Sequence, residues 1–244
     1  MKTPIHAMLL AAGFGTRLRP LTLKTPKCLV PIAGQPLLEH WLQSLEACNC
    51  SDVLINTHYL ADQVNAFLEK RPKSKMDIKS IYEPELLGTA GTLLANQNFF
   101  EGGIGLLIHA DNATNFNLNE LIEAHQRRPK ECLMTMLTFE TETPRQCGIV
   151  RVDANGTVMS FHEKVDNPPG NRANGAVYIF ENEFLKNVIT KIDGAYDFST
   201  DIIPNYLGKI YTYHTEKTYI DIGTPENLKK ASDLLGTDKR KEKD

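Results

Sequence analysis

Short apolar runs alternate with segments of helical periodicity along the first half of the chain. Residues 5–12 form an apolar run that stops at Gly13, which is typical of a strand buried on both faces. A helix is expected over residues 36–47, because one of its faces gathers Leu37, Leu38, Trp41, Leu42 and Leu45. The order then repeats, with strands expected at 53–56, 77–81 and 104–109 and helices at 61–70, 87–95 and 118–126. Such alternation predicts βαβ units and a mostly parallel sheet.

After Pro129 the pattern changes to closely spaced strands, expected at 132–139, 148–152, 158–162 and 176–180. Asp, Asn and Gly within residues 153–156 indicate a hairpin turn between two of these strands, so antiparallel pairs enter the sheet. The remaining elements are helices at 182–189, 200–207 and 225–235 and strands at 210–214 and 218–221. The predicted fold class is therefore α/β, with a Rossmann-like, doubly wound mixed sheet that is mostly parallel.

No linker or internal repeat divides the 244 residues. We therefore expect a single domain over residues 1–237, since a chain of this length buries roughly 70% of its unfolded surface. Residues 239–244 are all charged and lack apolar partners. For this reason we expect residues 238–244 to form a solvated, disordered tail.

Composition excludes several classes of protein. The 27 Lys and Arg against 30 Asp and Glu give a net charge of −3, without the basic surplus typical of nucleic-acid-binding proteins. The first apolar run is too short to span a bilayer and no cleavable signal pattern follows it, so we expect a cytoplasmic protein that does not act at a membrane. The five cysteines are scattered and no four ligands stand at zinc-site spacing, so we expect neither disulfides nor zinc. The oligomeric state stays open, a homo-oligomer included.

Residues 13–20, GFGTRLRP, follow the first expected strand and place two glycines where backbone amides can approach a phosphate closely. A Walker loop is excluded because the chain has no Gly-Lys-Ser/Thr, and the dinucleotide-binding fingerprint because Leu18 replaces its third glycine. Arg17 and Lys27 remain as two cations in a segment that prolines stiffen. A planar guanidinium and a point charge together suit a polyphosphate.

The longer string from Gly13 to His40, GFGTRLRPLTLKTPKCLVPIAGQPLLEH, resembles the signature of the sugar-nucleotide nucleotidyltransferases, also called NDP-sugar pyrophosphorylases. Further motifs match that family in order and spacing: LGTAGT at 87–92, ADN at 110–112, CGIV at 147–150, FHEK at 161–164, ANGAVYIF at 173–180 and YIDIGTPENL at 219–228. The resemblance implies the nucleotide-diphospho-sugar transferase fold and a mannose-1-phosphate guanylyltransferase-like member.

In this family a sugar 1-phosphate attacks the α-phosphorus of a nucleoside triphosphate, and pyrophosphate leaves. The resemblance implies that Arg17 holds the β- and γ-phosphates, that Lys27 contacts the α-phosphate region, and that Asp111 and Asp221 hold Mg²⁺. Asp111 follows the expected strand at 104–109 and Asp221 ends the one at 218–221, at the sheet edge where open α/β sheets bind ligands. Carboxylate, phosphate and water oxygens together suit an octahedral Mg²⁺. The implied catalytic residues are Arg17, Lys27 and Asp111.

The resemblance also implies which residues bind each of the two partners, the nucleoside triphosphate and the sugar 1-phosphate. The nucleotide-binding set is Ala11, Ala12, Gly13, Gly15, Thr16, Arg17, Glu83, Gly88 and Thr89. The sugar-phosphate-binding set is Asn112, Gly148, Glu163, Lys164 and Asn174. Consecutive residues of a strand point to opposite faces, so the side chains of Glu163 and Lys164 are not expected to bond the same atom.

Glu83 stands where thymidylyl members of the family usually have glutamine. An ionised carboxylate accepts hydrogen bonds and donates none, which suits the N1 and N2 donors of guanine better than the single imide donor of uracil or thymine. GTP is therefore favoured, with mannose 1-phosphate as the sugar. The alternatives are a uridylyl- or thymidylyltransferase acting on glucose, heptose or amino-sugar 1-phosphate, and a non-catalytic sugar-nucleotide-binding subunit. A degenerate subunit would be expected to lose a charged catalytic position, yet all of these are present: Arg17, Lys27, Asp111, Lys164 and Asp221.

Overall fold

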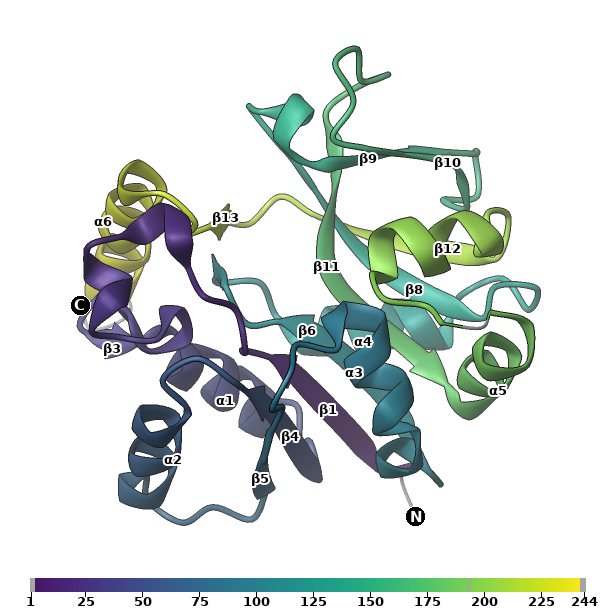
Figure 1. Ribbon diagram of the computed structural model, residues 1–244. Helices are drawn as coiled ribbons and strands as arrows, with labels where there is room; N and C mark the ends of the chain where they lie inside the picture. The colour runs from purple at the N-terminus through teal and green to yellow at the C-terminus, as the bar shows by residue number, and fades with distance from the viewer. Residues whose placement is uncertain (1–2, 193, 242–244) are drawn as a thin grey trace. The chain divides into compact units, whose positions relative to one another are not determined.

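The computed structural model of this chain describes residues 3–192 and 194–241. Its backbone divides into two compact units (Figure 1). Unit 1 comprises residues 1–6, 87–108 and 118–216, and unit 2 comprises residues 7–86, 109–117 and 217–244. Each unit thus gathers three separate stretches of the chain, while the single domain over residues 1–237 stays a prediction.

Unit 2 contains three neighbouring strands in the order β1-β4-β5, and most of β1 lies in this unit. The bounds are Ile5–Leu10 for β1, Asp52–Thr57 for β4 and Asp77–Tyr82 for β5. Strands β4 and β5 are parallel, with Asp52 opposite Asp77 and Thr57 opposite Tyr82. The helices of this unit are α1 (Leu37–Ala47), α2 (Ala61–Lys70) and α6 (Pro225–Lys241).

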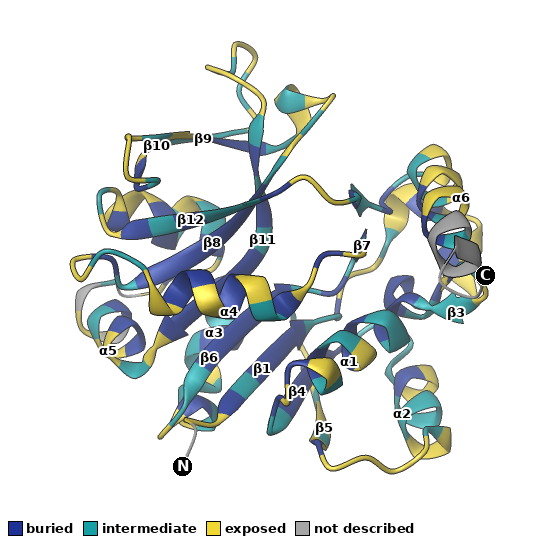
Figure 2. Ribbon diagram, turned by 180° about the vertical axis from the view of Figure 1, so that it is seen from behind, coloured by how far each residue is buried: buried dark blue, intermediate teal, exposed yellow. Residues whose placement is uncertain are grey.

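Helix α1 confirms the predicted amphipathic segment. All five residues assigned to its apolar face are buried: Leu37, Leu38, Trp41, Leu42 and Leu45. Strand β4 is buried from Val53 to Thr57, whereas α2 has only Val64 fully buried (Figure 2). The apolar core of unit 2 therefore lies between its strands and α1, whereas α2 lies at the surface of the unit.

Two short antiparallel pairs complete unit 2. One joins β2 (Pro31–Ile32) to β3 (Gln35–Pro36), and the other joins β7 (Asn112–Thr114) to β13 (Tyr219–Asp221). In the second pair Asn112 lies opposite Asp221, although about half of the chain separates them in sequence. This pairing brings the segment after β6 beside the segment that precedes α6.

Unit 1 contains the antiparallel part of the mixed sheet. Its strands are β6 (Ile104–His109), β8 (Met134–Glu140), β9 (Gly148–Val152), β10 (Val158–Glu163), β11 (Arg172–Glu181) and β12 (Ile210–Thr215). The order is β10-β9-β11-β6, and β8 pairs with β11 on one side and in parallel with β12 on the other. The predicted hairpin at residues 153–156 is confirmed, because β9 and β10 are antiparallel and Asp153 Oδ1 accepts the amide of Thr157 at 2.8 Å.

The helices of unit 1 are α3 (Gly88–Ala95), α4 (Leu118–Gln126) and α5 (Asn182–Lys191). Buried aromatic rings fill its core, among them Phe100, Tyr178, Phe180, Phe184 and Phe198. Figure 2 shows β8 and β11 as buried along most of their length. No helix in the described part of either unit combines the length and the apolar character that crossing a bilayer would require.

Two segments differ from the expected elements. The helix expected at 200–207 is instead a π-helical turn, Phe198–Ile202, followed by a 3₁₀ turn, Ile203–Tyr206. Pro204 lies in the second turn and has no amide hydrogen to donate, so regular α-helical bonding cannot continue through it. Helix α6 runs to Lys241 and thus through most of the expected tail, whose last residues, 242–244, lie outside the described residues.

A buried histidine of unit 1 makes stability depend on pH. His125 on α4 is 1% exposed and its Nδ1 lies 2.8 Å from the hydroxyl of Thr135. Burial, with a smaller effect of Arg128, lowers the pKa of His125 to about 3. The unfolded chain therefore binds a proton below pH of about 6.5 that the folded chain does not bind, so stability falls as pH drops towards the folded pKa.

His125→Asn retains a polar atom near Nδ1 and removes this titration. Denaturant unfolding between pH 5.5 and 4.5 should show the free energy of unfolding of the native chain falling by about 1.3 kcal/mol more than that of His125→Asn. Parallel pH profiles for the two proteins would contradict a neutral, buried His125.

Candidate active site

The loop after β1 holds its shape through a contact at Gly15. It passes through three 3₁₀ turns, Thr16–Leu18, Leu21–Leu23 and Lys27–Leu29. The hydroxyl of Thr22, which is fully buried, donates to the carbonyl of Gly15 at 2.7 Å. Gly15 has φ +60°, and a Cβ there would lie 2.9 Å from Thr22 Cγ2, so both conformation and space favour glycine. The folded loop places Arg17 and Lys27 on one short segment of unit 2.

The other loop residues of the predicted nucleotide-binding set differ in exposure. Gly13 and Thr16 are exposed, whereas Ala12 is buried. The amide of Ala11 donates to the side chain of Asn56 at 2.7 Å. The Ala11 amide is therefore engaged within the protein, and the exposed backbone begins at Gly13.

Lys27 brings the two predicted metal ligands together. Its ammonium nitrogen lies 2.7 Å from Asp111 Oδ2 and 2.9 Å from Asp221 Oδ1. Arg17 adds a second cation, with its Nη2 3.2 Å from Asp221 Oδ2. The side chain of Lys27 is 10% exposed and that of Arg17 is 61% exposed. Two cations and two carboxylates from three distant parts of the sequence thus converge in unit 2.

Backbone contacts fix the positions of both aspartates. The amide of Ile222 donates to the carbonyl of Asp111 at 3.2 Å, next to the β7–β13 pair. Asp221 Oδ1 also accepts the amide of Gly223 at 2.8 Å. The carbonyl of Asn112, the residue after Asp111, accepts the indole N–H of Trp41 at 3.0 Å. The acidic pair is therefore anchored to the buried face of α1.

The charges of this cluster persist at neutral pH. Burial alone would lower the pKa of Lys27, but Asp111 and Asp221 outweigh it and raise that pKa above 10.5. Burial alone would raise the pKa of Asp111, but Lys27 and His109 outweigh it and hold that pKa below 3.8. Burial raises the pKa of the neighbouring Cys28 thiol to about 12, so a thiolate nucleophile is not available there.

The acidic pair has the chemistry of a divalent-cation site. Asp111 and Asp221 already direct carboxylate oxygens at one cation, the Lys27 ammonium. Within the described residues, no group of three or more His, Cys, Asp or Glu side chains gathers in a metal-binding arrangement. Mg²⁺ commonly binds through one or two carboxylates and takes its other ligands from substrate phosphates and water. Asp111 and Asp221 therefore fit such an ion bound together with a nucleotide.

Glu83 is also in unit 2 and is only 3% exposed. Its Oε1 accepts the side-chain amide of Asn56 at 3.0 Å. Its backbone is held on both sides, because its amide donates to the carbonyl of Thr57 at 2.8 Å and its carbonyl lies 2.8 Å from His58 Nδ1. The carboxylate predicted to bind the base thus accepts a hydrogen bond from a side-chain amide and lies in the unit that contains Arg17 and Lys27.

Unit 1 contains the other predicted sugar-phosphate residues apart from Asn112. Glu163 ends β10, and Lys164 follows it with φ +48°. The left-handed backbone turns the Lys164 side chain back, so that its Nζ lies 3.0 Å from Glu163 Oε1. The expectation that these two neighbours point apart is therefore wrong, since Lys164 has left the strand. A Cβ on Gly148 would lie 2.5 Å from Glu163 Oε2, so this position must stay glycine for the carboxylate to lie there.

A bulge in β11 orients Asn174. The pairing of β11 with β8 shifts between Asn174 and Tyr178, and Ala176 inside the bulge has φ +53°. Asn174 Oδ1 accepts the amide of Ala176 at 2.9 Å, and its Nδ2 donates to the hydroxyl of Tyr178 at 2.7 Å. Burial raises the pKa of Tyr178, which keeps this hydroxyl protonated. The Asn174 side chain is thus fixed from two sides.

Asn112 lies in unit 2, beside Asp111. Its Nδ2 is 3.3 Å from Asp111 Oδ1 and 3.4 Å from the carbonyl of His109. The residue is 8% exposed. Its amide therefore supports the acidic pair.

Gly88 and Thr89 begin α3 in unit 1 and contact the segment around Asp197. The hydroxyl of Thr89 accepts the amide of Phe198 at 2.7 Å and lies 3.4 Å from Asp197 Oδ2. Asp197 Oδ1 accepts the amides of Ser199 and Thr200 at 2.8 and 3.1 Å. Thr89 thus links the start of α3 to the π-helical turn rather than capping its own helix.

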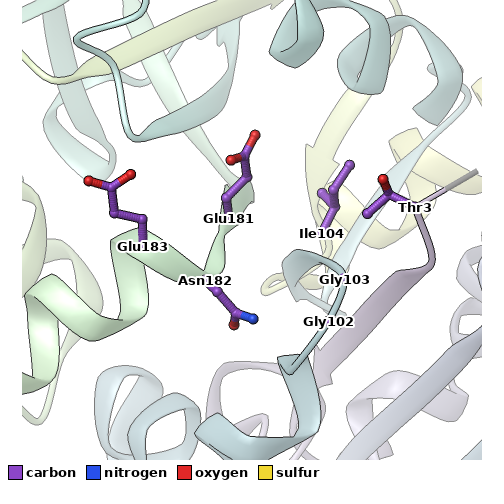
Figure 3. A pocket seen from close by; sticks show the side chains of 7 residues that line it. All are labelled: Thr3, Gly102, Gly103, Ile104, Glu181, Asn182 and Glu183. Carbon is purple, nitrogen blue, oxygen red and sulfur yellow. The ribbon is translucent and has the colours of Figure 1, made fainter.

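A surface pocket in unit 1 has a volume of about 320 Å³, and none of the predicted site residues is part of its lining (Figure 3). Its lining is Thr3, Gly102, Gly103, Ile104, Glu181, Asn182 and Glu183. Figure 3 shows the carboxylates of Glu181 and Glu183 on one side of it. Two carboxylates and no lining cation do not suit a phosphorylated ligand.

Sequence reasoning missed three residues that orient the predicted ones. Asn56, Tyr178 and Asp197 are hydrogen-bonded to Glu83, Asn174 and Thr89, respectively. Asn56 had a usable signal, since a polar amide interrupts the apolar strand VLIN. Tyr178 and Asp197 had none, because their contacts depend on a bulge and on a turn that periodicity does not predict.

Comparisons with known proteins identify the family of this chain. The family model described as "Nucleotidyl transferase" matches residues 6–237. The chain is 31% identical over 229 residues to "Mannose-1-phosphate guanylyltransferase catalytic subunit beta" of Drosophila melanogaster, with 91% of this chain and 60% of that protein covered. HddC from Yersinia pseudotuberculosis has a similar structure, with a TM-score of 0.76, 25% identity and coverage of 94% and 99%. A UDP-glucose pyrophosphorylase complexed with UDP-glucose matches with a TM-score of 0.81, 17% identity and coverage of 96% and 99%.

The fold is that of the doubly wound α/β nucleotidyltransferases, which confirms the predicted fold class. The chain belongs to the nucleotidyl transferase family, as the motifs indicated. It spans about 60% of the length of the curated relatives that it matches.

The structure predicts that Gly88 tolerates no side chain. Its φ is +75°, and a Cβ would lie 2.3 Å from the carbonyl oxygen of Tyr196. Gly102, in the same unit, is the matched control, because it has φ +78° and no atom within 4 Å of a Cβ. Both alanine substitutions impose a left-handed conformation, which costs roughly 1–2 kcal/mol, and Gly88→Ala adds about 1–3 kcal/mol of crowding. Denaturant unfolding should show this gap, and equal losses would contradict the close approach.

Proposed function

We propose that this chain is a sugar-1-phosphate nucleotidyltransferase that condenses a nucleoside triphosphate with a sugar 1-phosphate to give a nucleotide sugar and pyrophosphate. The observation behind this proposal is the convergence of Arg17 and Lys27 with Asp111 and Asp221 in one unit. Family membership supports the same reaction class.

The reaction needs charge neutralisation more than proton transfer. The attacking sugar-phosphate oxygen is already ionised near neutral pH, so no general base is required. Arg17 is exposed and bonds Asp221 through one nitrogen, which leaves guanidinium donors for the β- and γ-phosphates. The Lys27 ammonium bonds two carboxylates, and its third hydrogen is available for the α-phosphate.

Asp111 and Asp221 would hold Mg²⁺ alongside the nucleotide. A bound divalent ion would neutralise charge that develops on the phosphate oxygens. Their fixed backbone positions hold the carboxylates before any substrate binds. Asn112 supports this pair through Asp111 Oδ1.

GTP and mannose 1-phosphate are the substrates that the residues favour. The buried Glu83 carboxylate can accept hydrogen bonds from N1 and N2 of guanine, and the loop residues from Gly13 to Arg17 would contact the phosphates. Relatives at about 30% identity are named mannose-1-phosphate guanylyltransferases, which supports the same pair of substrates. For the sugar phosphate, Glu163 can accept hydroxyl hydrogens and Lys164 can bind the phosphate, with Gly148 and Asn174 in the same unit.

The second candidate is a uridylyl- or thymidylyltransferase acting on another sugar 1-phosphate. The structural likeness to a UDP-glucose pyrophosphorylase favours it. Glu83 argues against it, because a pyrimidine imide offers one donor to a carboxylate that can accept two.

Pyrophosphate release tests the reaction and its substrates together. GTP, UTP, dTTP, CTP and ATP are each incubated with mannose, glucose and glucosamine 1-phosphates and Mg²⁺. The highest rate is expected for GTP with mannose 1-phosphate, and chelation of Mg²⁺ should abolish it. If no pair releases pyrophosphate, and a heptose 1-phosphate added to the panel gives none either, the proposed reaction is contradicted and a non-catalytic subunit is favoured. If UTP or dTTP is used faster than GTP, the guanylyl assignment is wrong.

Arg17→Ala tests the role of the exposed guanidinium. We expect kcat/KM for pyrophosphate release to fall by about 10²–10³, as for the loss of a group that stabilises transition-state charge. The melting temperature should change little, because an exposed ion pair contributes about 0–1 kcal/mol. Arg19→Ala removes the same charge from the same exposed loop and should retain most of the activity. Equal losses in both variants would contradict a specific role for Arg17.

A further inference from the structure

Asn56 connects two parts of unit 2 that have different tasks in the proposed function. It lies near the end of β4 and is 4% exposed. Its Oδ1 accepts the amide of Ala11 at 2.7 Å, where the glycine loop begins. Its Nδ2 donates to Glu83 Oε1 at 3.0 Å, after β5. One buried amide therefore bonds both the start of the phosphate loop and the carboxylate proposed to bind the base.

The geometry leaves the Asn56 amide one orientation. The Ala11 amide can only donate, so the atom facing it must be the carbonyl oxygen of Asn56. With its oxygen on Ala11, the amide presents its nitrogen to Glu83 Oε1, to which it donates at 3.0 Å. Each partner thus requires a different end of the same side chain, and aspartate, alanine or leucine could not serve both.

The backbone of Glu83 is fixed independently of Asn56. Its amide donates to the carbonyl of Thr57 at 2.8 Å, and His58 Nδ1 lies 2.8 Å from its carbonyl. A carbonyl can only accept, so His58 carries its proton on Nδ1. The side chain of Glu83 still has rotatable bonds beyond this fixed backbone. The contact from Asn56 constrains those bonds at Oε1, which lies 3.0 Å from the Asn56 nitrogen.

We infer that Asn56 is a positioning residue for base selection: its amide holds the Glu83 carboxylate in the orientation that accepts the N1 and N2 donors of guanine, and ties that orientation to the phosphate loop through Ala11. The inference rests on the proposed guanylyltransferase function. It assigns to Asn56 no contact with substrate. Loss of Asn56 should therefore affect discrimination between bases more than the chemistry at the phosphates.

Discrimination between GTP and ITP measures this role, because inosine lacks the 2-amino group and is otherwise like guanosine. The readout is the ratio of kcat/KM for GTP to kcat/KM for ITP in pyrophosphate release. Asn56→Ala removes both contacts. Asn56→Asp retains an acceptor for Ala11 and removes the donor to Glu83. We expect the ratio to fall at least tenfold in both variants at pH 8, with a smaller change in kcat for GTP.

Thr57→Val is the matched control. Thr57 is the next residue of β4, is 2% exposed, and its hydroxyl donates to the carbonyl of Ile81 at 3.1 Å. The substitution removes a buried hydrogen bond between the same two strands without touching the Glu83 side chain. Its GTP to ITP ratio should match that of the native chain, even where its melting temperature falls as far as that of an Asn56 variant.

The outcomes separate the inference from the function on which it rests. If the native chain shows no preference for GTP over ITP and UTP, the guanine assignment fails and the inference falls with it. If the native chain prefers GTP and the folded Asn56 variants keep that preference within twofold, the inference alone is overturned. An equal loss of preference in Thr57→Val would reduce the effect to general destabilisation and would also overturn it. Asn56→Leu is close in size to the native residue and adds no buried charge, so it keeps the test valid where Asn56→Ala does not fold.

Discussion

The ammonium of Lys27, between the carboxylates of Asp111 and Asp221, is the contact on which the candidate site depends. Two carboxylates that approach a common point repel each other, and burial strengthens that repulsion. A cation held between them makes the approach favourable, and the loop after β1 supplies it. The fold of that loop around Gly15 and Thr22 is therefore needed for the acidic pair to form, as is the pairing of β7 with β13. The loop after β1 positions the Lys27 ammonium, and the β7–β13 pairing positions the two carboxylates that it contacts.

The two cations of the cluster differ in how readily they can change partners. Arg17 is 61% exposed and contacts Asp221 at 3.2 Å, so water and salt compete with that bond and little free energy opposes its exchange for a phosphate. Lys27 is 10% exposed and contacts both carboxylates, so removing it would leave Asp111 and Asp221 facing each other without a cation between them. The first cation is thus suited to an anion that arrives and departs. The second is suited to holding the acidic pair while it also contacts the phosphate at which bonds change.

Periodicity predicted the regular elements well, because a helix or strand that is buried on one face has apolar residues at regular intervals in the sequence. The five apolar positions of α1 and the turn at residues 153–156 are examples, and both are confirmed. Periodicity failed where the backbone hydrogen bonding is irregular. Pro204 replaces a helix by irregular turns, and the left-handed conformation of Lys164 turns its side chain towards Glu163. Motifs identified the charged residues of the site, since phosphate chemistry requires charge. They did not identify Asn56 or Tyr178, whose importance lies in a partner brought near by the fold.

A division of labour follows from the chemistry of the groups in unit 2. The charged side chains are proposed to bind the phosphates. Strong electrostatic attraction is needed there and base selectivity is not, because every nucleoside triphosphate presents the same phosphate groups. Glu83 accepts a hydrogen bond from the neutral amide of Asn56, and geometry has to distinguish one base edge from another there. A lysine beside Glu83 would compete with the base for the carboxylate oxygens, whereas the amide of Asn56 orients the carboxylate without adding a charge. The neutral Asn56 therefore suits base recognition, because its directional hydrogen bonds fix an orientation. The charged Lys27 suits the proposed catalysis, because its ammonium attracts phosphate whatever the base.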